Sequence, residues 1–146
     1  MVDSISKVMI ILFLLLVLAM QLKGIEIGDP IIPKKVTVEI TNKLNMTFLG
    51  LRCKEKHRDL GFHILNVGET YSFRFYPNFL FPATLYFCHF KYPGGDHHFD
   101  IYVQRRDYYC FHNRCSWEIV ENGPCKIKPR SRECFNWNVA FVPANK

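Results

Sequence analysis

Four histidines lie in or beside apolar, strand-like segments of this sequence, and histidine is the side chain best suited to proton transfer near neutral pH. They are His63, His89, His97 and His98. A ribonuclease would need two of them positioned as general acid and general base. No paired motif frames them, and the sequence lacks GxSxG, HExxH and a phosphate-cradling glycine-rich loop. We therefore expect no enzymatic activity and no catalytic residue.

The segment Asp96-His97-His98 carries residue types that ligate metals, and Asp100 would add a carboxylate on the face of His98. Adjacent residues of a strand, however, point to opposite faces of its sheet. The segment also follows the turn Pro93-Gly94-Gly95, so a polar hairpin tip explains it better than a metal site does. The sequence predicts no metal site and no cofactor.

The six cysteines offer a different chemistry, because an even number in a short exported chain is typical of a disulfide framework. Six cysteines can pair in 15 ways, and their spacing does not choose among them. Cys110-x4-Cys115 is too loose a spacing to indicate zinc, and no CxxC partner exists. We expect disulfides at all six positions, which are Cys53, Cys88, Cys110, Cys115, Cys125 and Cys134.

Export is indicated by the N-terminus. Lys7 precedes an unbroken apolar run from Val8 to Met20, which is shorter than the roughly 20 residues that span a bilayer core. This pattern is typical of a signal peptide, and Ala19 and Gly24 are small residues suited to a cleavage site. We predict a signal peptide at residues 1–24, cleaved between 19 and 24, and a secreted product with no membrane insertion after cleavage.

The elements that must position these side chains are strands. The aromatic-rich run Thr84–Tyr92 precedes a Gly-containing turn, and alternating residues follow it at Phe99, Ile101 and Val103. This pattern predicts a hairpin whose first strand is central in its sheet. Cys115, Trp117 and Ile119 would share one buried face. We expect Trp117 to pack against the segment Tyr71–Phe75 in a facing sheet.

Similar patterns predict further strands near residues 36–41, 47–53, 62–65, 71–76 and 124–127. A last strand is expected through Phe135, Trp137, Val139 and Phe141. Lys54–Asp59 and Lys128–Glu133 are expected to be charged loops, and residues 25–35 an extended arm. Turns recur about every ten residues. The predicted fold is all-β, a small disulfide-braced antiparallel β-sandwich forming a single domain at residues 36–146.

The chain has a formal net charge of +6, which outside the cell favours an acidic polysaccharide or an acidic receptor surface over nucleic acid. Seven basic residues would form a patch if their two segments lie at one end of the sandwich: Arg105, Arg106, Arg114, Lys126, Lys128, Arg130 and Arg132. The same basic residues would also be found in solvent-exposed loops that bind no partner. Asn45-Met46-Thr47 is a glycosylation motif at an expected turn.

An ordered series of short motifs resembles the plant self-incompatibility S1 family over about Val36 to Gly123. The matching motifs are Val38-x-Ile40-x-Asn42, Leu51-x-Cys53-Lys54, Asp59-Leu60-Gly61, Gly68-Glu69-Thr70-Tyr71-x-Phe73-x-Phe75, Pro77-Asn78-Phe79, Thr84-Leu85-x-Phe87-Cys88, Phe99-Asp100-Ile101-Tyr102 and Cys110-x4-Cys115-x-Trp117. The family usually has a Ser and an acidic run after its first cysteine, whereas Glu55–Arg58 precedes Asp59 here.

The resemblance implies a secreted β-sandwich in which Cys53, Cys88, Cys110 and Cys115 form two shared disulfides. Cys125 and Cys134 would then form a third, local bridge. Founding members of the family are pistil proteins that act as ligands of a pollen membrane receptor and arrest self pollen. The resemblance thus implies a non-enzymatic ligand of a membrane receptor, with an extracellular module that binds acidic cell-wall polysaccharide as the alternative.

Charged and aromatic residues in the expected loops are the candidate contacts, because loops held on a rigid scaffold commonly carry recognition. The segments are Lys54–Asp59, Pro93–His98 and Arg105–Arg114. The individual candidates are Lys54, Lys56, Arg58, Asp96, Arg105, Arg106, Tyr108 and Tyr109.

Overall fold

The computed structural model describes residues 1–23 and 34–138, and the chain divides into two compact units. The first unit contains helix α1 (Val2–Lys23), whose segment Val2–Met20 is long and apolar enough to cross a membrane. A signal sequence has the same length and composition. Of the predicted arm at residues 25–35, the structure describes only Lys34 and Lys35, which form no strand. Gly24, where the predicted cleavage region ends, also lies outside the described residues.

The second unit contains two sheets made from short strands. In chain order its elements are β1 (Val36–Asn42), β2 (Leu49–Glu55), β3 (Arg58–Leu65), β4 (Thr70–Phe75), β5 (Leu85–Tyr92), β6 (Gly95–Val103), α2 (Gln104–Asp107), β7 (Arg114–Val120), β8 (Gly123–Lys128) and β9 (Ser131–Cys134).

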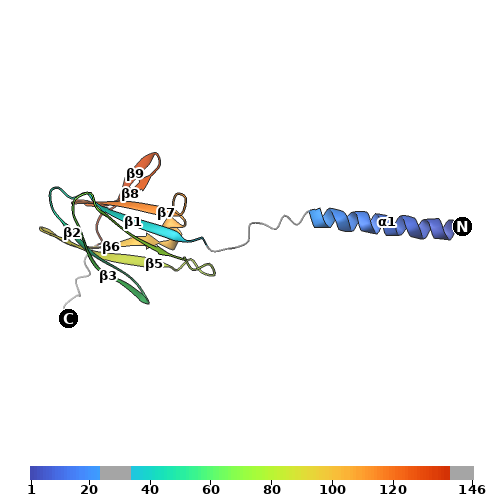
Figure 1. The fold of residues 1–146 in the computed structure, drawn as a ribbon, viewed down its shortest axis with the longest axis horizontal. Helices are drawn as coiled ribbons and strands as arrows, with labels where there is room; N and C mark the ends of the chain where they lie inside the picture. The colour runs from blue at the N-terminus through green and yellow to red at the C-terminus, as the bar shows by residue number, and fades with distance from the viewer. Residues whose placement is uncertain (24–33, 139–146) are drawn as a thin grey trace, which may run out of the picture. The chain divides into compact units, whose positions relative to one another are not determined.

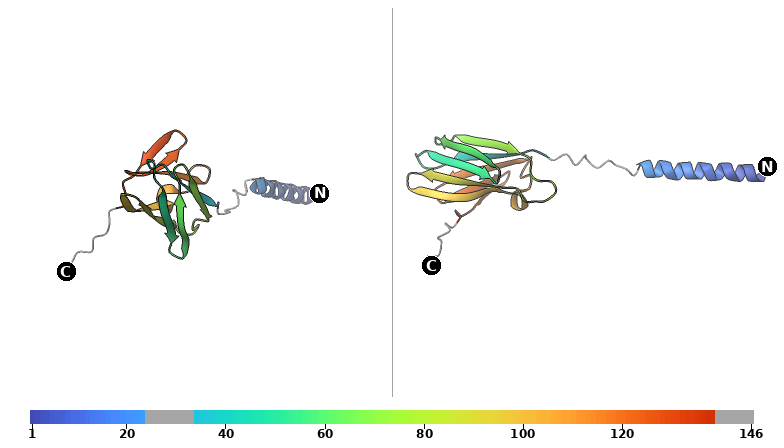
Figure 2. Two further views of the ribbon diagram at one scale, coloured as in Figure 1. Left: turned by 60° about the vertical axis from the view of Figure 1, so that its left-hand side comes forward. Right: turned by 90° about the horizontal axis from the view of Figure 1, so that it is seen from below.

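One sheet has the strand order β4-β1-β7-β8-β9 and the other β3-β2-β5-β6. Neighbouring strands are antiparallel, except that β1 runs parallel to β7. The two sheets form the layers seen in Figures 1 and 2, and the β8–β9 hairpin projects at the edge of the five-stranded sheet. The predicted all-β sandwich is confirmed.

The core fills the space between the layers because alternate residues of each strand point inward. Val36, Val38 and Ile40 of β1 are fully buried, as are the alternate residues Leu49, Leu51 and Cys53 of β2. Strand β5 lies between β2 and β6, the central place expected from its aromatic-rich sequence. Hydrophobic burial at about 25 cal/mol per Å² is the main force that holds such layers together.

Four expectations about the strands are wrong. Lys128–Glu133 is not a loop, because β8 runs to Lys128 and β9 begins at Ser131. Tyr71–Phe75 is β4, which belongs to the same sheet as Trp117, so Trp117 packs instead on Phe99 of the facing β6. Lys54–Asp59 is not a loop, because β2 continues to Glu55 and β3 begins at Arg58. No strand passes through residues 135–138, since β9 already ends at Cys134. Val139 and Phe141 lie outside the described residues.

All six cysteines pair in the structure. Cys53–Cys88 joins directly opposed residues of β2 and β5 in the core. Cys125–Cys134 joins opposed residues of β8 and β9, and Cys110–Cys115 closes the loop that leads into β7. The three bridges therefore brace the centre of one sheet, the outer hairpin of the other and one long loop.

Candidate recognition surface

The connections of the sandwich gather at two opposite ends. The end at which β1, β5 and β7 begin carries the turn 56–57, the loop 76–84, helix α2 with the loop 108–113, and the turn 129–130. We call it the loop end. The opposite end carries the loop 43–48 and the turns 66–69, 93–94 and 121–122, and because the predicted glycosylation site Asn45 lies there we call it the glycan end.

The first group of predicted contacts belongs to the β2–β3 hairpin at the loop end. Arg52 donates to the Asp59 carboxylate through both Nε and Nη2, and Lys54 Nζ lies 3.4 Å from the same carboxylate. The hydrogen bonds from Arg52, with a further one from the Gly61 N–H, hold the pKa of Asp59 well below its usual range. Lys54 is thus already paired, whereas Lys56 is exposed in the turn.

Asp96 is not near the other candidates. It begins β6 at the glycan end, where its carboxylate lies 2.5 Å from His89 Nε2. The hydrogen bond from His89 lowers the pKa of Asp96. The structure therefore separates Asp96 from the candidates at the loop end.

The group around α2 divides into exposed and packed side chains. Arg105 and Tyr108 are exposed, Tyr108 to 62%. Tyr109 is half-buried against the core. Arg106 lies over the rings of Phe99 and Trp117, with its guanidinium carbon 5.3 and 5.2 Å from their centroids. Arg105 and Tyr108 can meet a partner directly, whereas Tyr109 and Arg106 mainly support the fold.

Sequence reasoning missed Asp107, which is buried at the end of α2. It accepts hydrogen bonds from Arg106, Lys126 and the backbone N–H of Val103. Burial alone would raise the pKa of this carboxyl, but the two cations and the N–H keep its pKa below the usual value. In the sequence, Asp107 stands between two arginines and two tyrosines, and this pattern has no hydrophobic period that would indicate a buried position.

The expected basic patch is largely neutralised by ion pairs. Lys126 is buried against Asp107, which also binds Arg106. The remaining pairs are Arg114 with Glu39, Lys128 with Glu133 and Arg132 with Glu118. Within the described residues, only Arg105 and Arg130 of the seven lack an ion-pair partner. The two basic segments do meet at the loop end, but the acidic partners Asp107, Glu39, Glu133 and Glu118 offset part of their charge.

The β4–β5 loop presents an apolar surface that sequence reasoning passed over as a crossing segment. Phe79, Leu80 and Phe81 are exposed to 66%, 68% and 68%. The available signal was three consecutive large apolar residues between Pro77 and Pro82, a spacing that fits neither a strand nor a helix. Exposed aromatics in such a position are typical of contact residues.

Hydrogen bonds hold this apolar loop in one conformation. The Asn78 carboxamide accepts from the N–H groups of Leu80 and Phe81, and the Asn78 N–H donates to Thr84 Oγ1. Gln104, the first residue of α2, donates to the Asn78 carbonyl and accepts from the Thr84 N–H. The β4–β5 loop is therefore fixed to α2.

A groove of about 760 Å³ lies beside the same loop. Its walls come from the β2–β3 turn, the end of β4 and the start of β5. The lining residues are Glu55, Lys56, His57, Phe75, Tyr76, Asn78, Ala83, Thr84, Leu85, Tyr86 and Phe87. Lys56 and the apolar loop thus flank one concave surface.

The loop after α2 has an unusual backbone. Tyr108, Cys110, His112 and Asn113 all have φ between 48° and 61°, a region that side chains other than glycine seldom adopt. The Cys110–Cys115 disulfide spans this loop, and the Tyr102 hydroxyl donates to the Tyr108 carbonyl at 2.6 Å. Such conformations persist only where the surroundings impose them, so this loop too is held in a defined shape.

A model of the family described as plant self-incompatibility protein S1 matches residues 37–137. The chain belongs to this family. The match spans the whole sandwich described above, from β1 to the segment after β9.

Relatives in Arabidopsis thaliana agree with this assignment. S-protein homolog 2 is 44% identical over 112 residues, which are 71% of this chain and 69% of the relative. S-protein homolog 5 is 37% identical over 111 residues, which are 75% of this chain and 84% of the relative.

A solved structure of a self-incompatibility protein homologue shares the fold of this S1-family chain, with a TM-score of 0.57 and 16% identity. The structural match covers 73% of this chain and 97% of the chain in the solved structure. Its proteins are described as a widespread family of small, highly stable, secreted proteins from plants. The apolar N-terminal helix of this chain has the length and composition of a signal sequence.

Proposed function

We propose that this S1-family chain is a non-enzymatic protein ligand that a cell-surface receptor recognises through the loop end of its sandwich. The observation that carries the proposal is the exposed Phe79-Leu80-Phe81 surface, fixed to α2 through Asn78 and Gln104. A preformed apolar contact loses little conformational entropy when a partner binds. Rejection of self pollen is one process that such recognition would serve.

The position of the glycosylation motif supports this choice of surface. Asn45 is exposed in the β1–β2 loop at the glycan end, and its backbone N–H donates to Glu121. A glycan at Asn45 would stand away from the apolar loop and the groove, because they lie at the opposite end. The loop end would thus stay accessible to a protein partner in a glycosylated molecule.

Binding to a receptor can be tested with protein purified from the medium of cells that express and secrete the full chain. The labelled protein should bind responsive plant cells saturably, and protease treatment of the cells should abolish the binding. Replacing both Phe79 and Phe81 by Ser should weaken it at least about tenfold, since buried aromatic contacts dominate such interfaces. Phe62→Ser is the matched control, because Phe62 is 60% exposed on the outer face of β3.

Three results would count against this function. If the double variant binds as well as wild type, the apolar loop is not the contact. If binding survives protease treatment but collapses in moderate salt, an acidic polysaccharide is the partner instead. Turnover of RNA by the purified protein, abolished by replacing one histidine, would show an enzyme.

A further inference from the structure

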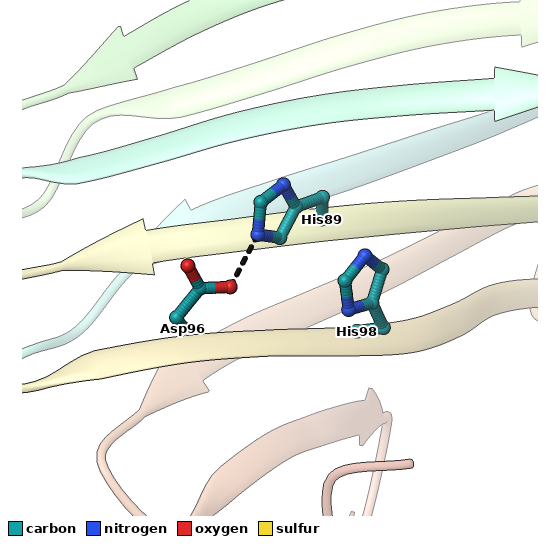
Figure 3. Close-up of side chains that lie close together, drawn as sticks. All are labelled: His89, Asp96 and His98. Atoms are coloured by element: carbon teal, nitrogen blue, oxygen red, sulfur yellow. Dashed lines mark hydrogen bonds and ion pairs between the residues drawn. The ribbon is translucent and has the colours of Figure 1, made fainter. Parts of the chain in front are cut away.

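Three side chains that can ligate a metal meet on the outer face of the four-stranded sheet, outside the proposed receptor contact. His89 of β5 lies directly opposite His98 of β6 in the strand register, and Asp96 precedes His98 by two residues on the same face. The His89 and His98 rings are stacked with centroids 4.3 Å apart and an interplanar angle of 1°. Figure 3 shows the Asp96 carboxylate beside the His89 ring, with His98 as its neighbour.

We propose that His89, Asp96 and His98 form a binding site for a divalent transition-metal ion such as Zn²⁺. One ligand atom from each residue lies within 4.8 Å of the other two. Two imidazoles and one carboxylate are a donor set that suits Zn²⁺ and its first-row neighbours, and such a site keeps a position open for water or another ligand. The site is independent of the proposed receptor contact.

The backbone places these three residues, while small side-chain rotations would complete the site. Bonds of about 2.0–2.1 Å from zinc to its ligands bring the ligand atoms to about 3.3 Å of one another. The three side chains can move because all are at least partly exposed. His97 takes no part, because it points to the other face and stacks on Trp137 at 4.6 Å. Because His97 points to the opposite face from Asp96 and His98, the run Asp96-His97-His98 did not by itself indicate a metal site.

The surrounding charges set the conditions for binding. On the same outer face, Lys91 lies opposite Asp96 and Arg52 opposite His89, although Arg52 is already paired with Asp59. Asp100, two residues beyond His98, adds a negative charge. The two cations weaken the attraction for a metal ion, so we expect affinity in the micromolar range rather than that of a structural zinc site.

The test is a calorimetric titration of the secreted, purified protein with Zn²⁺ at pH 7.5, repeated with Co²⁺ to read the visible absorption of the bound ion. Wild type should bind one ion per chain, and its melting temperature should rise with Zn²⁺ concentration. His89→Ala and His98→Ala should each lower the affinity at least about tenfold and remove the rise in melting temperature. His57→Ala is the control, since His57 is exposed in the β2–β3 turn.

Because all three side chains lie on the surface, the variants should fold, which near-ultraviolet circular dichroism will verify. NMR provides a second measurement, since Zn²⁺ should shift the imidazole signals of His89 and His98 but not those of His57. Absence of one-to-one binding by wild type would overturn the proposal. Equal binding by the folded His89→Ala/His98→Ala double variant would overturn it as well.

Discussion

Lys126 Nζ lies 2.6 Å from Asp107 Oδ1, and both side chains are withdrawn from water, with exposed fractions of 9% and 0%. Arg106 binds the other carboxylate oxygen, Oδ2, at 2.7 Å. The three charged side chains join α2 to β8 beside Trp117, over whose ring both cations lie. This arrangement fixes the helix at the loop end to the five-stranded sheet.

Asp107→Ala should therefore destabilise the fold by about 3–5 kcal/mol, because it leaves Lys126 buried without a counter-charge. Lys126→Met should cost less, since Arg106 still neutralises Asp107. Urea unfolding of the secreted proteins measures both. If Lys126→Met proves the more damaging variant, Arg106 does not compensate Asp107 as the geometry indicates.

The stability that Asp107 supplies should depend on pH. The pKa of Asp107 is lower in the folded state than in the unfolded state. At pH values between these two pKa values, the unfolded chain therefore binds more protons than the folded chain. The contribution is complete above the unfolded pKa of about 3.9 and disappears as pH falls through the folded value. The difference in unfolding free energy between wild type and Asp107→Ala should be constant from pH 5 to 7 and shrink below about pH 4. A difference that grows on acidification would contradict this.

Trp117→Ala should destabilise the fold by roughly 3–5 kcal/mol, because it removes a buried ring that meets Phe99 across the sandwich and leaves a cavity. Tyr108→Ala is the control and should stay within about 1 kcal/mol, because the Tyr108 ring is exposed. Tyr109 is unsuitable as a control, since it packs against the core. Thermal unfolding measures both changes, and similar melting temperatures for the two variants would refute the assignment of Trp117 to the core.

The secreted protein should contain no reactive thiol, since all six cysteines are paired. Replacing Cys53 and Cys88 by Ala should cost about 4 kcal/mol on chain-entropy grounds, because that bridge closes the longest of the three loops, with a sequence separation of 35. Replacing Cys125 and Cys134 should cost less, about 2.6 kcal/mol, since they are 9 residues apart. Thiol labelling and urea unfolding measure these effects. Two labelled cysteines in native protein would disprove the framework.

Asn45→Gln should remove a glycan and leave recognition unchanged, because Asn45 lies at the glycan end. The protein should migrate faster on a gel, as it should after enzymatic deglycosylation. Binding to responsive cells should match that of wild type. A loss of binding in Asn45→Gln would mean that the glycan end contributes to recognition.

The candidate site could be predicted only in part from the sequence. Lys56, Arg105 and Tyr108 are exposed at the loop end. The sequence predicted this exposure because charged and aromatic residues in loops commonly face solvent. Asp96 lies at the other end, and Lys126 is buried. The apolar loop Phe79–Phe81 was missed because three adjacent apolar residues show no periodicity that distinguishes an exposed loop from a buried segment.

The sequence by itself determined which residues of each strand point inward, because alternation is a local property of an extended chain. Val38, Cys115 and Trp117 are buried as that alternation requires. Only the tertiary structure decided which sheet each strand joins, that Asp107 meets Lys126, and that His89 meets His98. These relationships depend on pairing between distant segments, which no local period encodes, so they follow from the packing of the whole sandwich.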